Sequence, residues 1–467
     1  ATSEIKRTSP RNYKWTPPLT DAFAKRTFMG YHRPDGQVGT ANYWLVIPMV
    51  FCENRMVEII RDAVMPELGF KKNSPYAQFA GELANLYKQG ASRDDIGRAE
   101  VKKVQQGHVK EKLFRNVSGI RFITHDGGCG GTRQDAEALC GLLAGYITHP
   151  NVAGATVLSL GCQNAQLSVL HQEIRKRDAN FSKPLFEFEH QNIGTEEELV
   201  ERAIKSIFEG MAIADQSERK PAPLSKLCIG LECGGSDGFS GISANPAIGH
   251  VSDLIVALGG SAVLSEFPEL SGVEQDLYDR CVNQDDAGKF LNLMKSYDAL
   301  AHHVGSGFDK NPSPGNIKDG LITDAMKSAG AAKKGGTSPV AGVLDYPGKV
   351  TGNGLHLLCT PGNDVESVTA EVASGANIVL FTTGLGTPTG NPVVPVIKIS
   401  TNTALYEKMT DIMDINAGPI IDGIESIEET AGRILDYVID TASGIKEPAA
   451  VRNDQADFIP WKRGVSL

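Results

Sequence analysis

The chain has 467 residues, 41% of them hydrophobic and 22% charged, which is ordinary for a globular enzyme of two or three domains. Its formal net charge of −10 argues against a nucleic-acid partner or an anionic membrane surface, since both bind basic faces. No apolar run approaches the roughly 18 residues of a membrane span. The eight cysteines are too sparse for a secreted disulfide scaffold, so we expect a protein of the reducing cytoplasm.

The first part of the chain alternates between apolar runs and helical patterns. Residues 1–26 are polar and punctuated by prolines, which predicts a linker or tail. The predicted strands that follow are 43–51, a run beginning at Gly119, 155–160 and 184–189. The predicted helices are 55–68, a segment ending near Tyr146, and 196–209. Residues 74–106, rich in Lys and Glu, are interpreted as a solvated helical insertion.

The second part opens with the stretch LCIGLECGGSDGFSGISANP, residues 227–246. It reads as a buried strand over 227–231, then a polar Gly-rich loop, then a helix from about Ala247. Later predicted strands are 261–264, 355–358, 377–381 and 393–399. A helix is expected over 321–332, and Lys333 and Lys334 at its end are interpreted as caps that complement the helix dipole.

This alternation predicts an α/β fold of two Rossmann-like parallel-sheet domains, with the active site at the carboxyl ends of the strands. The polar stretch 216–223, with its two prolines, is interpreted as the domain boundary. The predicted division is a tail over 1–26, a first α/β domain over 27–222, a second over 223–448 and a C-terminal tail over 449–467. Because parallel strands end at one edge, the polar loops that follow them are expected to form one catalytic cleft.

Several cysteines occupy these loops. Those that directly follow an apolar run or stand in a glycine loop are Cys52, Cys129, Cys162, Cys233 and Cys359. His125, Cys129, Cys162 and Cys233 lie at three predicted strand ends, and imidazole with thiolate suits a transition metal. An iron–sulfur cluster is the alternative, although the usual close cysteine spacings are absent. A cysteine at a strand end can equally be a small buried residue.

Candidate proton-transfer and substrate groups occupy the same loops. Glu266 and Asp237 are candidate carboxylates, whereas Glu269 is expected to be a cap or solvated. Lys398, inside an apolar strand run, either snorkels to solvent or faces a substrate carboxylate or a proton, and we favour the second. The glycine loops lack dinucleotide and Walker spacings, so their hydroxyl and amide groups suit a polyhydroxylated anion. The predicted substrate-binding residues are Ser236, Asp237, Ser240, Asn245, Asn316, Thr382 and Thr383.

Taken together, the motifs resemble a family of sugar-acid dehydratases typified by altronate and galactarate dehydratases. The matching pieces are FMGYHRPDGQVGTANY, THDGGCGG, LGCQ, ECGGSDGFSGISANPAIG, NPSPGN, KGGT, FTTGLGTPTG, PVIKI, TNTAL, MDINAG and DFIPWKRG, which span about residues 28–464. The large subunit of sulfolactate sulfo-lyase is a relative of this family. Single-chain members carry a small β-rich N-terminal domain before the FMGY segment, which this sequence lacks, so we expect it on a partner subunit or in a part of the protein outside this sequence.

The resemblance implies a cytoplasmic hydro-lyase that converts a hexonate or hexarate into a 2-keto-3-deoxy sugar acid with Fe2+ or Mn2+. It implies that His125 and Cys129, with Cys162 or Cys233, lie at the metal and that Lys398 and the Ser236 and Thr383 loops hold substrate. His125, Glu266 and Lys398 are the predicted catalytic residues. We expect a homo-oligomer acting on a small sugar acid.

The C-terminal DFIPWKRG motif favours D-altronate as the substrate. The alternatives are a galactarate dehydratase and the large subunit of a sulfolactate-type C–S lyase. A non-catalytic sugar-acid binding protein is the least favoured.

Overall fold

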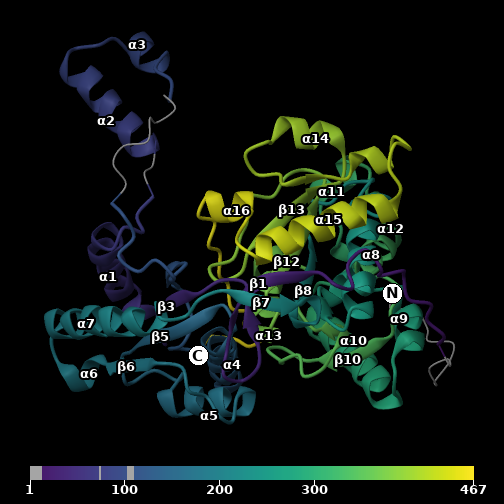
Figure 1. Cartoon of the computed structure of the whole chain (residues 1–467), viewed down its shortest axis with the longest axis horizontal. Helices are drawn as coiled ribbons and strands as arrows, with labels where there is room; N and C mark the ends of the chain where they lie inside the picture. The colour runs from purple at the N-terminus through teal and green to yellow at the C-terminus, as the bar shows by residue number, and fades with distance from the viewer. Residues whose placement is uncertain (1–12, 73–74, 102–109, 467) are drawn as a thin grey trace.

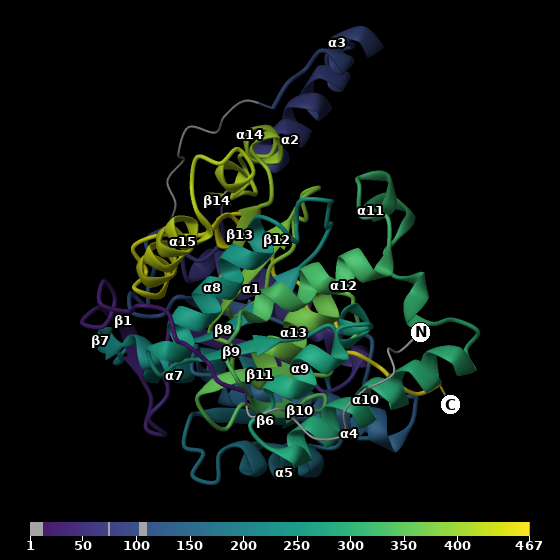
Figure 2. The same cartoon turned by 90° about the vertical axis from the view of Figure 1, so that its right-hand side faces the viewer.

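Two parallel β-sheets organise the chain in the computed structural model, which describes residues 13–72, 75–101 and 110–466 (Figures 1 and 2). The smaller sheet has the strand order β4-β3-β5-β6 and the larger one β10-β11-β9-β8-β12-β13-β14. The prediction of an α/β fold with parallel sheets is confirmed. No helix in the described part of the chain combines the length and apolar character that crossing a bilayer requires.

The four-stranded sheet is covered by helices on both faces. Its strands are β3 (Tyr43–Pro48), β4 (Gly119–Phe122), β5 (Val152–Ser159) and β6 (Leu185–Glu189). Its helices are α1 (Asn54–Glu67), α4 (Arg133–Thr148), α5 (Leu167–Arg177), α6 (His190–Ile193) and α7 (Glu196–Ala214). Along β3, Trp44 packs in the hydrophobic core on one face and Leu45 in the core on the other. A strand buried on both faces reads as a continuous apolar run, which is why the sequence reveals it.

The seven-stranded sheet forms the other half of the molecule. Its strands are β8 (Cys228–Cys233), β9 (Ser261–Leu264), β10 (Val340–Leu344), β11 (Gly354–Leu358), β12 (Ile378–Thr383), β13 (Val396–Ser400) and β14 (Ile415–Asn416). The surrounding helices are α8 (Ala244–Ala257), α9 (Glu274–Arg280), α10 (Gln284–His303), α11 (Pro314–Lys318), α12 (Asp324–Ala332), α13 (Asp364–Ser374), α14 (Thr403–Lys408) and α15 (Ile427–Ala442). Short 3-10 helices are η1 (Phe51–Glu53), η2 (Leu224–Lys226), η3 (Phe267–Leu270), η4 (Phe308–Lys310), η5 (Lys333–Gly335) and η6 (Gly418–Ile420).

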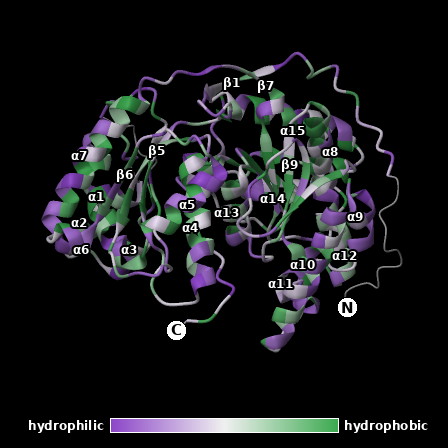
Figure 3. Cartoon of the chain, turned by 90° about the horizontal axis from the view of Figure 1, so that it is seen from below, coloured by the Kyte–Doolittle hydropathy of each residue, from purple (hydrophilic) through white to green (hydrophobic). Residues whose placement is uncertain are grey.

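Helices α4 and α13 lie between the two sheets and pack against each other, as Figure 3 shows from below. Tyr146 of α4 and Val372 of α13 belong to one hydrophobic core, which also contains Phe381 of the larger sheet. The two sheets therefore share buried apolar surface, and this contact fixes one sheet relative to the other.

The stretch predicted as a domain boundary contains a strand. Residues Lys220–Pro223 form β7, which pairs antiparallel with β1 (Thr27–His32), and β1 also pairs with β2 (Val38–Gly39). The prolines of β7 are tolerated because it is an edge strand of this small sheet. Whether the chain divides into domains at this point stays a prediction.

The C-terminal segment joins both halves. It begins with α16 (Ala449–Arg452), and further on Phe458 stacks edge-on against Tyr146 at 5.0 Å. The backbone N–H of Ile459 then donates to Thr369 Oγ1 at 3.2 Å.

The predicted insertion is a helical excursion. Helices α2 (Pro75–Lys88) and α3 (Arg93–Gly97) bury none of their residues and project from the rest of the chain (Figures 1 and 2). The parts of the insertion at 74 and 102–106 lie outside the described residues.

Candidate active site

A set of buried acids and lysines lies where the strands of the larger sheet end. We call it the acid–lysine cluster; its members are Glu232, Cys233, Glu266, Glu269, Lys327, Lys334, Asp364, Glu371 and Lys398. Glu232 and Cys233 end β8, Glu266 follows β9, and Asp364 begins α13 after β11. Strands β9, β8 and β11 are neighbours in a parallel sheet, so their carboxyl ends bring these groups together.

Glu266 and Lys334 form the centre of the cluster. Lys334 Nζ lies 2.5 Å from Glu266 Oε2 and donates to Cys233 Sγ at 3.1 Å, and both charged side chains are at most 1% exposed. The prediction that Lys334 caps a helix end at the surface is therefore wrong. A buried ammonium requires an ionised or strongly polar partner, and the Lys334 ammonium has two, the Glu266 carboxylate and the Cys233 sulfur.

A second ion pair stands beside the first. Lys327 Nζ lies 2.6 Å from Glu269 Oε1, which also accepts a hydrogen bond from Asn311 Nδ2 at 3.2 Å. Cys233 Sγ lies 3.6 Å from Glu269 Oε2 and 3.8 Å from Glu266 Oε2, so this thiol connects the two pairs. Glu269 was expected to be a cap or solvated, but it is 3% exposed and lies inside the cluster.

The cluster tunes its carboxyl groups toward neutral pH. Burial raises the pKa of Glu266 to about 7, with a further rise from the Glu269 charge that Lys334 opposes. Burial also raises the pKa of Glu371 to about 8, against the hydrogen bond that its Oε1 accepts from Ser265 Oγ at 2.7 Å. Groups that titrate near 7 are suited to proton transfer at physiological pH.

The backbone at Glu266 is itself unusual. Its φ of 61° and ψ of 58° lie in the left-handed region, which costs a residue with a Cβ about 1–2 kcal/mol. The Glu266 N–H donates to Thr360 Oγ1 at 2.8 Å, and this bond helps to hold the conformation. Backbone strain at a buried titratable residue is a feature of functional sites.

Lys398 lies on β13 at the edge of the cluster. Its Nζ sits 3.4 Å from the centroid of the Phe381 ring and donates to Thr389 Oγ1 at 3.1 Å. Burial lowers the pKa of Lys398 to about 7, although the charges of Asp364 and Asp414 raise it. Lys398 is fully buried, so it does not snorkel to solvent.

Unpartnered carboxyl oxygens face the interior of the cluster. Within the described residues, Glu232 Oε1, Glu266 Oε1 and Glu371 Oε2 are buried and receive no backbone N–H or hydroxyl donor. The Glu232 and Glu266 carboxyl groups can hydrogen-bond to each other when one of them holds a proton. Glu232, Glu266 and Asp364 each offer an oxygen within 4.8 Å of the others. Because bare carboxylates repel, a shared proton or a cation must stabilise this group. Gly234 leaves space for the Asp364 carboxyl group, since a Cβ at position 234 would stand 1.8 Å from Asp364 Oδ2.

The predicted substrate-binding residues mainly bond to one another and to nearby backbone. Asp237 accepts hydrogen bonds from Thr401 Oγ1 at 2.9 Å, Ser240 Oγ at 3.0 Å and Asn402 Nδ2 at 3.1 Å. Further bonds of this kind include Thr382 Oγ1 to Asn245 Oδ1 at 2.6 Å, Asn316 Nδ2 to Ser236 O at 2.8 Å, and Gly386 N to Thr383 Oγ1 at 3.0 Å. These contacts hold the loops after β8 and β12 together beside the acid–lysine cluster.

The predicted metal ligands fall into two places. Cys233 belongs to the acid–lysine cluster, whereas His125, Cys129 and Cys162 lie in loops after β4 and β5 of the smaller sheet. His125 is 6% exposed; its Nε2 lies 2.8 Å from Pro48 O and its Nδ1 accepts from Gly127 N at 3.2 Å. Both ring nitrogens are thus occupied by backbone, and burial lowers the pKa of the ring.

A pocket of about 260 Å³ lies between the ends of the two sheets. One wall is formed by Phe122, Ile123 and Thr124, where β4 ends, and another by Val365, next to Asp364. The C-terminal segment closes it with residues 456–459. The negative charge of Asp457, one of these residues, raises the pKa of Lys398.

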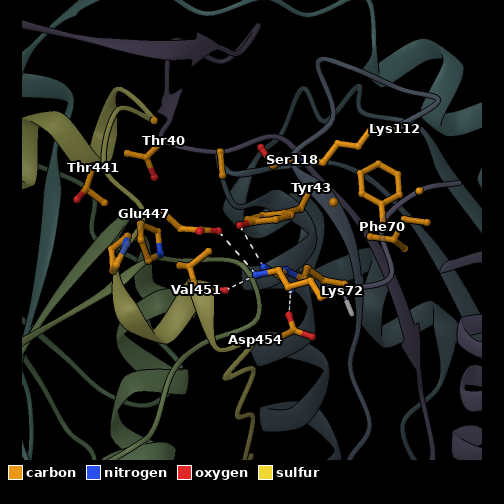
Figure 4. A pocket seen from close by; sticks show the side chains of 18 of the residues that line it. Thr40, Tyr43, Phe70, Lys72, Lys112, Ser118, Thr441, Glu447, Val451 and Asp454 are labelled. Atoms are coloured by element: carbon orange, nitrogen blue, oxygen red, sulfur yellow. Dashed lines mark hydrogen bonds and ion pairs between the residues drawn. The ribbon is translucent and has the colours of Figure 1, made fainter. Parts of the chain in front are cut away.

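A cavity of about 560 Å³ lies instead at the amino ends of the smaller sheet (Figure 4). Tyr43 and Gly119, the first residues of β3 and β4, line it, and none of the predicted site residues does. Two of its basic groups already have partners: Lys72 Nζ donates to Val451 O at 2.7 Å, and Arg121 Nη1 lies 2.8 Å from Asp454 Oδ1. The acid–lysine cluster, not this cavity, holds the groups that titrate near neutral pH.

Sequence reasoning selected Glu266 and Lys398 but missed other members of the cluster. The missed residues are Glu232, Lys327, Lys334, Asp364 and Glu371. Glu232 carried a local signal, because a carboxylate in a buried apolar strand needs a partner. Lys327 and Glu371 lie in helical segments and show no such signal.

Comparison with known proteins identifies the family. The D-galactarate/altronate dehydratase C-terminal domain matches residues 224–466, and the D-galactarate dehydratase/altronate hydrolase second domain matches residues 30–215. Altronate dehydratases of Bacillus subtilis (strain 168) and Escherichia coli (strain K12) are 34% and 30% identical over 458 residues, 97% of this chain and 82% of each relative. The L-threo-forming galactarate dehydratase of Escherichia coli (strain K12) is 36% identical over 303 residues, 64% of this chain and 58% of that protein. The chain therefore belongs to the D-galactarate/altronate dehydratase family.

Proposed function

We propose that the chain is a hydro-lyase that dehydrates D-altronate to a 2-keto-3-deoxy sugar acid, with its active site at the carboxyl ends of the parallel strands. The similarity to altronate dehydratases over nearly the whole chain supports the substrate. The observation that carries the mechanism is Glu266, a buried carboxyl group with a pKa near 7 paired with a buried lysine.

The reaction needs a base, an acid and a means of stabilising negative charge. The C2 proton of a sugar acid lies next to a carboxylate and is poorly acidic, so charge that develops on that carboxylate must be neutralised. The base takes the C2 proton, the C3 hydroxyl leaves with a proton from an acid as water, and the resulting enol becomes the 2-keto acid. One substrate thus gives one product and one water, with no redox change.

The acid–lysine cluster supplies these roles. Glu266, ionised above its pKa, accepts the C2 proton, and Lys334 at 2.5 Å keeps its carboxylate available at neutral pH. Glu232 holds a proton, because burial and then the Glu266 charge raise its pKa well above the ordinary range, so it can protonate the leaving hydroxyl. Lys398 binds the substrate carboxylate, whose charge would restore the ammonium form.

The implied Fe2+ or Mn2+ would be held by the carboxyl groups of Glu232, Glu266 and Asp364. As ligands Glu232 and Glu266 would carry no proton, so the acid and base roles given above belong to the chain without the ion. Two of their oxygens, Glu232 Oε1 and Glu266 Oε1, are buried without a hydrogen-bond partner. Oxygen donors suit a divalent ion of this kind. The set of Cys233, Glu266 and Glu269 fits less well, because Lys334 and Lys327 already neutralise it. A bound divalent ion would supply Lewis-acid neutralisation of the substrate carboxylate.

We propose that substrate binds in the pocket of about 260 Å³, whose wall residue Val365 follows Asp364 in the chain. We further propose a cytoplasmic homo-oligomer, associated with a small β-rich domain or subunit. All eight cysteines are free, which supports a reducing compartment.

The test is a substrate panel. The protein, purified without oxygen and supplied with Fe2+ and a thiol reductant, is incubated separately with altronate, galactarate and sulfolactate. We expect a 2-keto acid from altronate. A 2-keto acid from galactarate alone would transfer the assignment to galactarate dehydration, and release of sulfite from sulfolactate would identify a C–S lyase instead.

A further inference from the structure

Three thiols outside the acid–lysine cluster stand apart from the other cysteines. Cys52, Cys129 and Cys162 are exposed, whereas the remaining five cysteines are buried or half-buried. They follow β3, β4 and β5, which are adjacent in the smaller sheet in the order β4-β3-β5. Parallel neighbours end at one edge, so the three loops meet there.

Hydrogen bonds hold these loops against one another. Phe51 N donates to Gly127 O at 3.0 Å, which joins the Cys52 turn to the Cys129 loop. Asn164 Nδ2 donates to Cys129 O at 2.7 Å, which joins the Cys162 loop to the same segment. The bonds of His125 to Pro48 O and Gly127 N add a further connection between the first two loops. The place of the thiols is therefore built by the fold.

Glycine is required where two of these loops cross. Gly128 has a φ of 97°, and a Cβ there would stand 2.2 Å from Met49 O. The backbone preceding Cys129 can approach the segment preceding Cys52 this closely only because Gly128 has no side chain.

The three thiols are close enough to influence one another. Desolvation raises the pKa of Cys52, and the neighbouring Cys129 and Cys162 thiols raise it further. Gln191 Nε2 donates to Cys162 Sγ at 3.3 Å, a contact that suits a thiolate. Each thiol must lose its proton to bind a metal, and a bound metal centre then compensates the negative charge that the three thiolates bring together.

At least one pair of these thiols is spaced more widely than the ligands of a single ion. Three thiolates on one tetrahedral metal with bonds of about 2.3 Å would lie about 3.8 Å apart. Among the described residues, the Sγ atoms of Cys52, Cys129 and Cys162 do not all lie within 4.8 Å of one another. A wider spacing is what a cluster requires, because each thiolate then binds a different iron atom.

We propose that Cys52, Cys129 and Cys162 hold a [4Fe–4S] cluster whose fourth iron has no cysteine ligand. This centre is distinct from the carboxylate site of Glu232, Glu266 and Asp364, and it replaces the predicted grouping of Cys129 and Cys162 with His125 and Cys233. Phe122, Ile123 and Thr124, which lead into the Cys129 loop, line the 260 Å³ pocket, so an open iron near Cys129 would serve the substrate proposed to bind there. Only that last role rests on the proposed function.

The proposal is tested on protein purified and reconstituted without oxygen with Fe2+ and sulfide. We expect about four acid-labile sulfide per chain, about four cluster iron plus one more when the carboxylate site is loaded, and a visible sulfur-to-iron absorption band. Cys52→Ser, Cys129→Ser and Cys162→Ser should each lose most of the sulfide and the band. Cys281→Ser is the matched control; its thiol donates to Leu277 O at 3.4 Å, a bond that a serine hydroxyl can keep. Iron without labile sulfide in the wild-type chain, or a full cluster in any of the three variants, would overturn the proposal.

A second measurement uses the unmodified chain, so it does not depend on the folding of a variant. Maleimide labelling read by mass spectrometry should modify all three cysteines in the cluster-free protein and none in the reconstituted one. Equal labelling in both states would also overturn the proposal. The sulfide content and the labelling are measured without any enzymatic reaction. A cluster found in a protein that is inactive on altronate would therefore refute the proposed substrate and leave the cluster proposal standing. Loss of turnover in Glu266→Gln with its cluster intact separates the two sites.

Discussion

Replacing Glu266 by glutamine tests the proposed base directly. Glutamine keeps the shape of the side chain and one acceptor oxygen, but it cannot take up the C2 proton. General-base catalysis contributes about 10²–10⁴-fold, which corresponds to about 3–5 kcal/mol of transition-state stabilisation. We therefore expect kcat on altronate to fall by two to four orders of magnitude, with a much smaller change in KM.

The pH profile gives the variant a readout that a structural defect would not produce. Glu266 acts as a base only when ionised, so kcat/KM of the wild type should rise tenfold per pH unit below its pKa of about 7. Above pH 7 kcat/KM should fall again, because Lys398, whose pKa is also about 7, loses the proton that binds the substrate carboxylate. Glu266→Gln should lack this rise. The assay measures 2-keto acid formation between pH 5 and 9, together with exchange of the C2 proton in D₂O, which should disappear in the variant.

The same substitution leaves Lys334 without its carboxylate partner, so stability must be followed separately. Breaking a buried ion pair costs about 3–5 kcal/mol, but Cys233 still accepts a hydrogen bond from Lys334 at 3.1 Å, so we expect the lower end of this range. Glu187→Gln on β6 is the control and should keep full turnover; it removes a carboxylate that lies 2.7 Å from His171 Nε2 of α5, outside the acid–lysine cluster. A folded Glu266→Gln with wild-type kcat and an unchanged pH profile would refute the assignment.

Three further substitutions probe the rest of the cluster. Lys398→Met should raise KM for altronate about 10–100-fold, because a charged hydrogen bond to the substrate carboxylate contributes about 1.5–3 kcal/mol; an unchanged KM would contradict this role. The folded pKa of Glu371, about 8, lies above its ordinary value of 4.5, so the folded state holds the extra proton and the wild type loses stability as pH rises from about 4.5 to 8. The Tm of Glu371→Gln relative to wild type should therefore increase over that interval, and a constant difference would argue against a protonated Glu371. Gly234→Ala should abolish turnover, since its Cβ would fall 1.8 Å from Asp364 Oδ2; an active variant with unchanged metal content would show that Asp364 can move without consequence.

Local sequence pattern predicted the strands well where both faces of a strand are buried. The expected strand 261–264 is β9 as observed, and the run 355–358 lies within β11. Burial on both faces makes such a strand a continuous apolar run, and the polar residues that follow it mark its end. The same pattern drew attention to Glu266 and Lys398. Glu266 is a carboxylate directly after an apolar strand, and Lys398 is a charged residue inside one.

Lys334 shows where local reasoning stopped. In sequence it stands in a Lys-Lys-Gly-Gly stretch after a helix, which is typical of an exposed helix end. In the fold, η5 packs against α8 and β9 and carries this lysine beneath the ends of β8 and β9, where Cys233 and Glu266 receive its ammonium. Its partners lie 101 and 68 residues away, a separation at which periodicity carries no information.

The sequence by itself determined the α/β class, most of the strands and the chemical character of the loops that end them, because these depend on burial and hydrogen bonding over a few residues. Only the tertiary structure decided which loops meet. Strands β3, β4 and β5 pair in one sheet and β8 in another, so Cys129 and Cys162 join Cys52, while Cys233 joins Glu266 and Glu269. Strand pairing joins segments that lie far apart in the sequence, so no local pattern encodes it, and the packing of α4 against α13 then sets one sheet against the other.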